Sequence, residues 1–184
     1  LTRVIGGPTL PDLDPFLLLD EFGTDRAEDY IAGFPEHPHR GFETVTYMLD
    51  GRMRHRDNHG NEGLLTPGSV QWMTAGRGLV HSEMPEQESG QMRGFQLWVN
   101  LPAQDKMGAP GYQTLLDAQI PSVELPEGAG RVRIIAGRFD GHAGPARTHT
   151  PMNVWDIRLR QGHHAELPVA DGRTLALVVL KGTV

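Results

Sequence analysis

The chain has 184 residues, 38% of them hydrophobic, which is enough to build one large domain or two small ones. The 17 Lys and Arg residues against 23 Asp and Glu residues give a formal net charge of −6, which argues against broad nucleic-acid binding through phosphate neutralisation. Cysteine is absent, and this excludes a disulfide framework, thiolate zinc sites and cysteine nucleophiles together.

No stretch of the sequence has the composition of a membrane-spanning helix or a signal peptide. The longest apolar run, 175–180, is far shorter than the roughly twenty residues that a span requires. We therefore expect a cytoplasmic monomer that contacts neither membrane nor nucleic acid directly. Because the sequence starts at Leu1 and stops within Lys-Gly-Thr-Val, we also expect segments of a longer protein to be missing at both ends.

Short runs of residues separated by turn signals predict an all-β fold. The 23 glycines and 14 prolines are spread evenly, as is typical of proteins built from many short strands. Several runs alternate, so that Val45, Tyr47 and Leu49 should face away from Thr44, Thr46 and Met48. The predicted strands are 16–19, 43–49, 51–57, 63–65, 69–73, 93–101, 131–137, 152–159, 164–167 and 174–179.

Two turns and one candidate helical turn punctuate these strands. Asp50-Gly51 predicts a tight hairpin between the second and third runs. Thr66-Pro67-Gly68-Ser69 predicts another turn, with Pro presetting φ and Gly free to take a positive φ. Helical periodicity is nearly absent, and only 102–116 could hold a short helical turn. We expect two β-units, at 1–120 and 121–184.

Two pairs of potential ligands stand out, His37-Pro38-His39 and His81-Ser82-Glu83. Residues two apart on a strand share a face, so neighbouring segments would bring the four side chains to one point. Three imidazoles and a carboxylate suit a first-row divalent metal such as Fe, Mn, Ni or Cu, and leave two octahedral positions open. The alternative is chance spacing among nine histidines, and Pro38 argues against a regular central strand there.

Beyond these pairs, several blocks of sequence resemble the pirin family. They are DPFLLLDEFG (14–23), FPEHPHRGFETVTYMLDG (34–51), HRDNHGNEG (55–63), PGSVQWMTAGRGLVHSEMP (67–85) and GFQLWVNLP (94–102). They stand in the family's order over most of the first hundred residues. The second half, with KMGAPGYQ (106–113) and TPMNVWDIRL (150–159), is a looser match.

The resemblance implies a bicupin, with two antiparallel, jelly-roll-like β-barrel domains stacked face to face and a metal only in the first. The second barrel would be incomplete in this chain. Carried over, the metal ligands would be His37, His39, His81 and Glu83. The metal would be a single divalent ion, Fe(II) ahead of Mn, Ni, Cu, Co or Zn.

Two glutamates compete for the fourth ligand position. Glu43 stands where many cupins place a glutamate ligand, whereas the resemblance to pirins favours Glu83. Glu43 would then be a substitute carboxylate or one that orients a metal-bound imidazole. Otherwise it is an ordinary exposed strand residue. Either Glu83 or Glu43 could act as the catalytic base for a substrate hydroxyl.

Other histidines carry weaker signals. His55 and His59 flank a predicted hairpin and could line the pocket or only cap turns. In the second unit, His163 and His164 are adjacent and should face opposite sides of a strand, while His142 and His149 are seven apart. We therefore expect no second metal site there.

Two functions remain open from the sequence. The resemblance implies a metal-dependent dioxygenase of the quercetin 2,3-dioxygenase type, acting on a small aromatic, flavonol-like substrate. It alternatively implies an iron-dependent redox sensor that binds a partner protein. An aromatic-lined cavity formed by Trp72, Phe95 and Trp98 would suit a flat flavonol, but these residues are equally suited to a barrel core.

Overall fold

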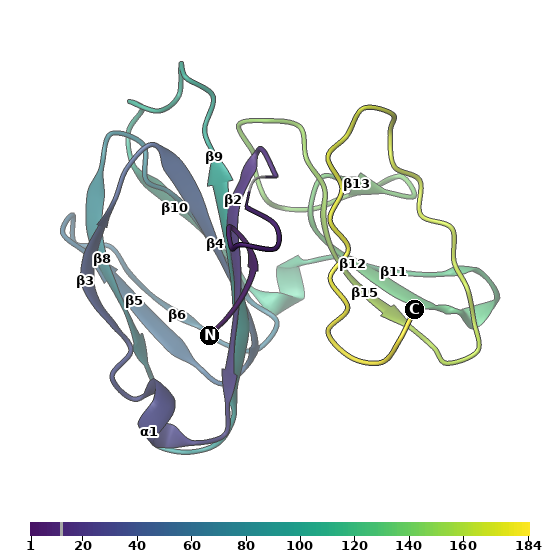
Figure 1. The fold of residues 1–184 in the computed structure, drawn as a ribbon, viewed down its shortest axis with the longest axis horizontal. Coiled ribbons are helices and arrows are strands. Elements are labelled where there is room, and N and C mark those ends of the chain that lie inside the picture. Colours follow the sequence, from purple (N-terminus) through teal and green to yellow (C-terminus); the bar gives the residue numbers. More distant parts are fainter. Residues whose placement is uncertain (12) are drawn as a thin grey trace.

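The computed structural model describes residues 1–11 and 13–184 and is almost entirely β. Every strand pair within its sheets is antiparallel. Figure 1 shows two lobes, an N-terminal one drawn from purple to teal and a C-terminal one drawn from green to yellow. This agrees with the expected all-β bicupin.

The N-terminal lobe consists of two sheets. The six-stranded sheet has the order β1 (Thr2–Ile5), β2 (Phe16–Thr24), β9 (Met92–Asn100), β4 (Phe42–Asp50), β7 (Val70–Thr74) and β10 (Gly111–Leu115). The four-stranded sheet has the order β3 (Phe34–His39), β8 (Leu79–Pro85), β5 (Met53–Asp57) and β6 (Glu62–Leu65).

The C-terminal lobe is smaller. Its three-stranded sheet has the order β11 (Ser122–Glu124), β12 (Gly130–Ala136) and β15 (Val154–Leu159), and β13 (Arg138–Phe139) pairs with β14 (His142–Ala143). The helical elements are short, namely α1 (Ala27–Tyr30) and the 3-10 turns η1 (Asp117–Gln119) and η2 (Pro126–Gly128). Among the described residues, no helix is long and apolar enough to cross a bilayer.

Strand alternation decides what each face of the six-stranded sheet contacts. On β4, Met48 joins Met53 and Leu65 of the four-stranded sheet in a buried cluster between the two sheets. Val45, on the opposite face, packs against Ile135 and Ala136 of the C-terminal lobe. The alternation expected for this strand is therefore confirmed, because one face lines the barrel and the other supports the second lobe.

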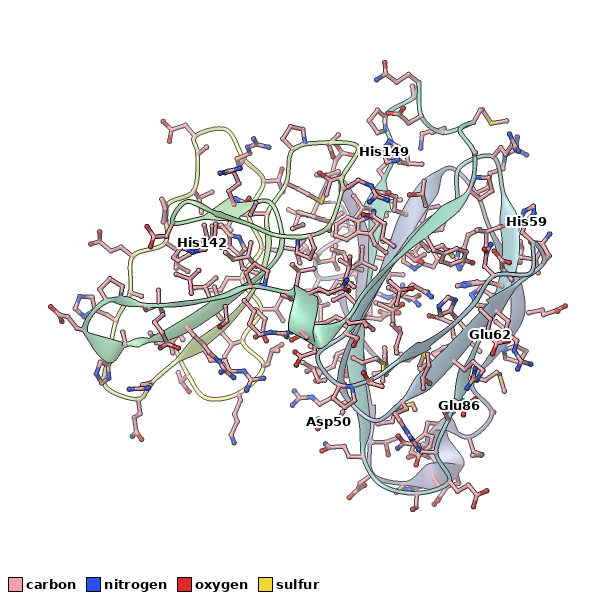
Figure 2. The ribbon with its side chains drawn as sticks, turned by 180° about the vertical axis from the view of Figure 1, so that it is seen from behind. Asp50, His59, Glu62, Glu86, His142 and His149 are labelled. Atoms are coloured by element: carbon pink, nitrogen blue, oxygen red, sulfur yellow. The ribbon has the colours of Figure 1, made fainter. Side chains whose placement is uncertain are left out.

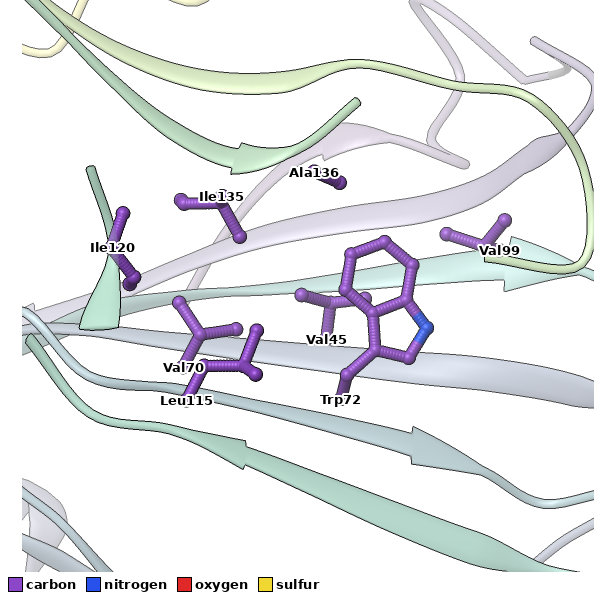
Figure 3. Packing of buried hydrophobic residues seen from close by; sticks show 8 residues of the cluster. All are labelled: Val45, Val70, Trp72, Val99, Leu115, Ile120, Ile135 and Ala136. Carbon is purple, nitrogen blue, oxygen red and sulfur yellow. The ribbon is translucent and has the colours of Figure 1, made fainter. Parts of the chain in front are cut away.

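A second apolar cluster lies at the junction of the lobes. Figure 3 shows its residues, which come from both sides: Val45, Val70, Trp72, Val99, Leu115, Ile120, Ile135 and Ala136. Trp72 is completely buried there, on the face of β7 that turns away from the barrel interior. It therefore belongs to the core between the lobes and does not line a cavity inside the barrel.

Two expectations about local structure were wrong. Asp50-Gly51 is not a hairpin turn, because β4 and β5 belong to different sheets and the turn carries the chain across the barrel. Segments 164–167 and 174–179 are not strands, and in the second of them Leu175 and Leu177 are more than 60% exposed, so burial does not hold that segment in a sheet. Segment 102–116 holds a short helical turn, as expected, because the N–H groups of Asp105 and Lys106 both donate to the Pro102 carbonyl, and it ends in strand β10, which pairs with β7.

The turn at Thr66–Ser69 is confirmed by the Ser69 N–H donating to the Thr66 carbonyl at 3.0 Å and by the positive φ of Gly68, 82°. The two-unit boundary near residue 120 stays a prediction. In the structure β10 ends at Leu115 and β11 begins at Ser122.

Candidate metal centre

Two neighbouring strands of the four-stranded sheet position the histidines. β3 and β8 are antiparallel, and His37 is the register partner of His81. An irregularity between Phe34 and His37 shifts the register, so that Phe34 pairs with Glu83. β3 is the edge strand of its sheet, which explains how Pro38 is accommodated, because an edge strand can leave one N–H side unpaired.

The three imidazoles converge. One ring nitrogen from each of His37, His39 and His81 lies within 4.8 Å of the other two. The Nε2 atoms of His37 and His81 are 3.0 Å apart, and the ring centroids of His39 and His81 are separated by 4.9 Å. Among residues 1–11 and 13–184, no other group of His, Cys, Asp or Glu meets this geometry.

Burial keeps the imidazoles of His39 and His81 neutral. Burial lowers the pKa of His39 to about 4, and the nearby His37 lowers it further. Burial lowers the pKa of His81 to about 3, followed by the effects of His37 and His39. A neutral imidazole has the lone pair that a metal ligand needs, so both residues are ready to coordinate near neutral pH.

The donor set fits a divalent metal. His37 Nδ1 lies 2.8 Å from the Pro35 carbonyl, and this contact favours the tautomer whose Nε2 lone pair faces the cluster. The buried Nε2 of His39 has no hydrogen-bond partner in the part of the chain that is described. Buried polar atoms are normally paired, so a cation bound between these rings would satisfy them.

Glu83 lies on the same strand and face as His81 and is almost completely buried, with an exposed fraction of 1%. Its Oε1 accepts a hydrogen bond from Thr46 Oγ1 at 3.0 Å, and its Oε2 accepts one from Gln96 Nε2 at 2.9 Å. Burial raises the pKa of Glu83, against the opposing effects of Thr46, Gln96 and His37. A buried carboxylate of this kind needs a positive partner, which a divalent ion would provide.

The structure does not place a Glu83 oxygen in the compact histidine group. It brings together three of the four expected ligands, and it holds the fourth nearby through residues of the opposite sheet. The role of Glu83 as a ligand therefore stays a proposal.

Glu43 lies elsewhere. It shares a face of β4 with Val45, so it points towards the C-terminal lobe and away from the barrel interior. Thr74 Oγ1 donates to Glu43 Oε1 at 2.7 Å, and His149 Nε2 lies 3.8 Å from the same oxygen. Glu43 is buried, not exposed as the simplest interpretation assumed, and the strand period puts it on the face of β4 opposite Thr46, which contacts Glu83; its role as a ligand or catalytic base stays a prediction.

The remaining histidines are dispersed. Figure 2 shows His59 at the edge of the N-terminal lobe, His142 in the C-terminal lobe and His149 where the lobes meet. His55 lies inside the barrel with an exposed fraction of 2%, opposite Glu83 in the register of β5 and β8, and stacks on Tyr112 with centroids 5.2 Å apart. Of the two histidines flanking the hairpin, only His55 lies in the interior.

Sequence reasoning missed two polar residues of the site, Thr46 and Gln96. Both lie on the six-stranded sheet, and the alternation of their strands is the signal that could have placed them inside the barrel. Trp98 was expected beside the ligands, and its ring lies edge-on to His39 with centroids 5.3 Å apart.

The N-terminal lobe matches the Pirin family model over residues 1–99. The chain belongs to the pirin family. It is 55% identical over 186 residues to a pirin-like protein of Caulobacter vibrioides, covering 100% of this chain and 67% of the relative. The chain thus spans about two thirds of the length of that curated relative.

Solved pirin and quercetin dioxygenase structures share the fold. A quercetin 2,3-dioxygenase from Acinetobacter baumannii is 39% identical with a TM-score of 0.74, covering 82% of this chain and 55% of that one. The bacterial pirin YhhW from Escherichia coli, solved in complex with nickel(II), is 22% identical with a TM-score of 0.54, covering 70% of this chain and 58% of that one. The latter likeness concerns the fold alone.

Proposed function

We propose that this pirin is a metal-dependent dioxygenase of the quercetin 2,3-dioxygenase type, with Fe(II) held by His37, His39, His81 and Glu83. The observation that carries the proposal is the cluster of three imidazole nitrogens within 4.8 Å of one another. The likeness to the Acinetobacter baumannii quercetin 2,3-dioxygenase supports the choice of reaction and of a flavonol substrate.

The burial of the cluster suits a site that admits a substrate from one side. His39 and His81 are buried, whereas His37, on the edge strand β3, is half-buried. The cluster therefore comes closest to solvent at His37. When bound, the metal would polarise the substrate hydroxyl and provide an electronic path between flavonol and dioxygen.

The protein's own contribution is to hold the reacting groups in a buried site and to take up a proton. His39 and His81 offer neutral imidazoles, and Glu83 would accept the proton of the 3-hydroxyl, since burial raises its pKa towards the range of a useful base. Trp98 and Phe42, whose ring centroids are 4.6 Å apart, form an aromatic wall beside His39. Dioxygen added across the 2- and 4-carbons would break both bonds to the 3-carbon, which would leave as carbon monoxide, and the two oxygen atoms would remain in the depside.

The test is aerobic turnover of quercetin by protein reconstituted anaerobically with Fe(II), followed by loss of flavonol absorbance and release of carbon monoxide. We expect turnover in the wild type and in His142→Ala, which changes an exposed histidine of the other lobe. We expect none in His37→Ala or Glu83→Ala. Absence of turnover in a wild type with one bound Fe(II) would contradict the proposal and favour the redox-sensor alternative, which partner capture in the ferrous and ferric states would then examine.

A further inference from the structure

The Glu83 carboxylate is held from the opposite side of the barrel. Both of its hydrogen-bond donors, Thr46 on β4 and Gln96 on β9, belong to the six-stranded sheet, whereas Glu83 belongs to the four-stranded one. Each carboxylate oxygen accepts one of these bonds and keeps a further lone pair. The two donors thus fix the position of the carboxylate without using up its capacity to bind a cation.

The orientation of Gln96 is itself fixed by a second residue. The Trp98 indole N–H donates to Gln96 Oε1 at 3.0 Å. An amide has one acceptor oxygen and one donor nitrogen, so engaging the oxygen turns the NH2 group towards Glu83. Without the indole N–H the amide could rotate by half a turn and present its oxygen to the carboxylate, which would repel it.

Trp98 also touches a second proposed ligand. Its ring lies edge-on to that of His39, with centroids 5.3 Å apart and an angle of 84° between the planes. The Trp98 indole therefore contacts the His39 imidazole of β3 directly through its ring. It acts on the Glu83 carboxylate of β8 indirectly, because its N–H orients Gln96. The proposed ligands all belong to the four-stranded sheet, and Trp98 connects two of them to the six-stranded sheet.

We propose that Gln96 and Trp98 are positioning residues for the metal centre, acting through Glu83, with Thr46 as the second hydrogen-bond donor. This inference rests on the proposed metal site but not on the substrate. Outer partners that orient a ligand typically change metal affinity by about ten- to a hundredfold when they are removed. The structure assigns this role to an amide and an indole on β9.

The first test removes the indole N–H donor of Trp98 but keeps an aromatic ring at this position. Trp98→Phe retains an aromatic side chain beside His39 and removes the N–H that orients Gln96. Trp72→Phe and Trp155→Phe are matched controls, because Trp72 packs between the lobes and Trp155 in the C-terminal lobe, and neither indole N–H donates to Gln96 in the described part of the chain. The probe is Co(II), whose affinity is measured by competition with a chelator and whose ligand field is read from its visible absorption bands.

We expect Trp98→Phe to bind Co(II) about tenfold more weakly with shifted absorption bands, and both controls to match the wild type in affinity and bands. Unchanged affinity and bands in Trp98→Phe would overturn the inference. Equal shifts in all three variants would also overturn it, because they would indicate a general packing effect.

A second pair of variants tests the same inference in case Trp98→Phe does not fold. Thr46→Val removes the hydroxyl donor at nearly constant volume, and Thr46→Ser keeps it. We expect Thr46→Val to reproduce the shift in Co(II) bands and Thr46→Ser to restore them; identical spectra for the two would count against the assignment. A wild type that binds no Co(II) would overturn the metal site and this inference together, whereas Co(II) binding without quercetin turnover would contradict only the proposed reaction.

Discussion

His37 and His81 face each other across two neighbouring antiparallel strands, with their Nε2 atoms 3.0 Å apart. Together with a ring nitrogen of His39, these atoms lie close enough to share one bound cation. The relationship arises from a register pairing of residues 44 positions apart in the sequence. It is the feature on which the proposed chemistry depends.

The two buried histidines make the stability of the metal-free protein depend on pH. In the unfolded chain their pKa is near 6.5, but burial lowers it to about 4 for His39 and about 3 for His81. Between these values and 6.5 the unfolded state binds more protons, so the free energy of unfolding falls as pH falls.

Urea denaturation of metal-free protein at a series of pH values from 7 to 4 would measure this loss. We expect a shallower decline in His39→Gln, which removes one of the two shifted groups, than in the wild type or in His142→Gln. Equal slopes in all three proteins would contradict the low pKa of His39.

Substitution of the two candidate glutamates should have different effects on metal affinity. Glu83→Gln removes a negative charge next to the histidines, and we expect at least a tenfold loss in Co(II) affinity. Glu43→Gln changes a residue that faces the other lobe, and we expect the wild-type affinity. Isothermal titration of both variants measures the difference, and a weakened Glu43→Gln protein with an unaffected Glu83→Gln protein would reverse the assignment.

Gly63 leaves room for the buried His55 ring. A Cβ atom built at this glycine of β6 would lie 2.3 Å from His55 Nε2. Gly63→Ala should therefore displace the ring and destabilise the protein by about 1–3 kcal/mol.

Gly111→Ala is the matched control for this change, since a Cβ there has no heavy atom within 4 Å. Thermal denaturation of both variants compares them directly. A melting temperature of Gly63→Ala no lower than that of Gly111→Ala would show that the space beside His55 is not needed.

Arg133 joins the two lobes through buried polar contacts. Its guanidinium donates to Tyr47 Oη at 2.5 Å, to the Gly68 carbonyl at 2.9 Å and to Asp117 Oδ1 at 2.6 Å. Arg133→Met would leave these acceptors without their donor, and we expect a loss of about 2–3 kcal/mol in unfolding free energy.

The neighbouring Arg131→Met is the control, because Arg131 lies on the same strand but is exposed. Chemical denaturation should show little change in that variant. Equal effects of the two substitutions would indicate that the contacts of Arg133 add nothing to stability.

The sequence by itself determined the all-β class and the family, and it predicted the three histidines that the structure brings together. Strand alternation is a local property, so the spacing of His37 with His39, and of His81 with Glu83, already showed that each pair shares a face. The turn at Thr66–Ser69 was predictable for the same reason, since Pro and Gly act through their own backbone angles.

Only the tertiary structure decided which strands meet and which face turns inward. Glu43 and Thr46 lie on one strand, but the packing of the second lobe on Val45 directs Glu43 towards that lobe and Thr46 towards Glu83. The Asp50-Gly51 turn had the chemistry of a hairpin, yet it joins two sheets, because strand pairing depends on contacts between residues far apart in sequence. The hydrogen bond from Gln96 to Glu83 likewise exists only once the two sheets pack face to face.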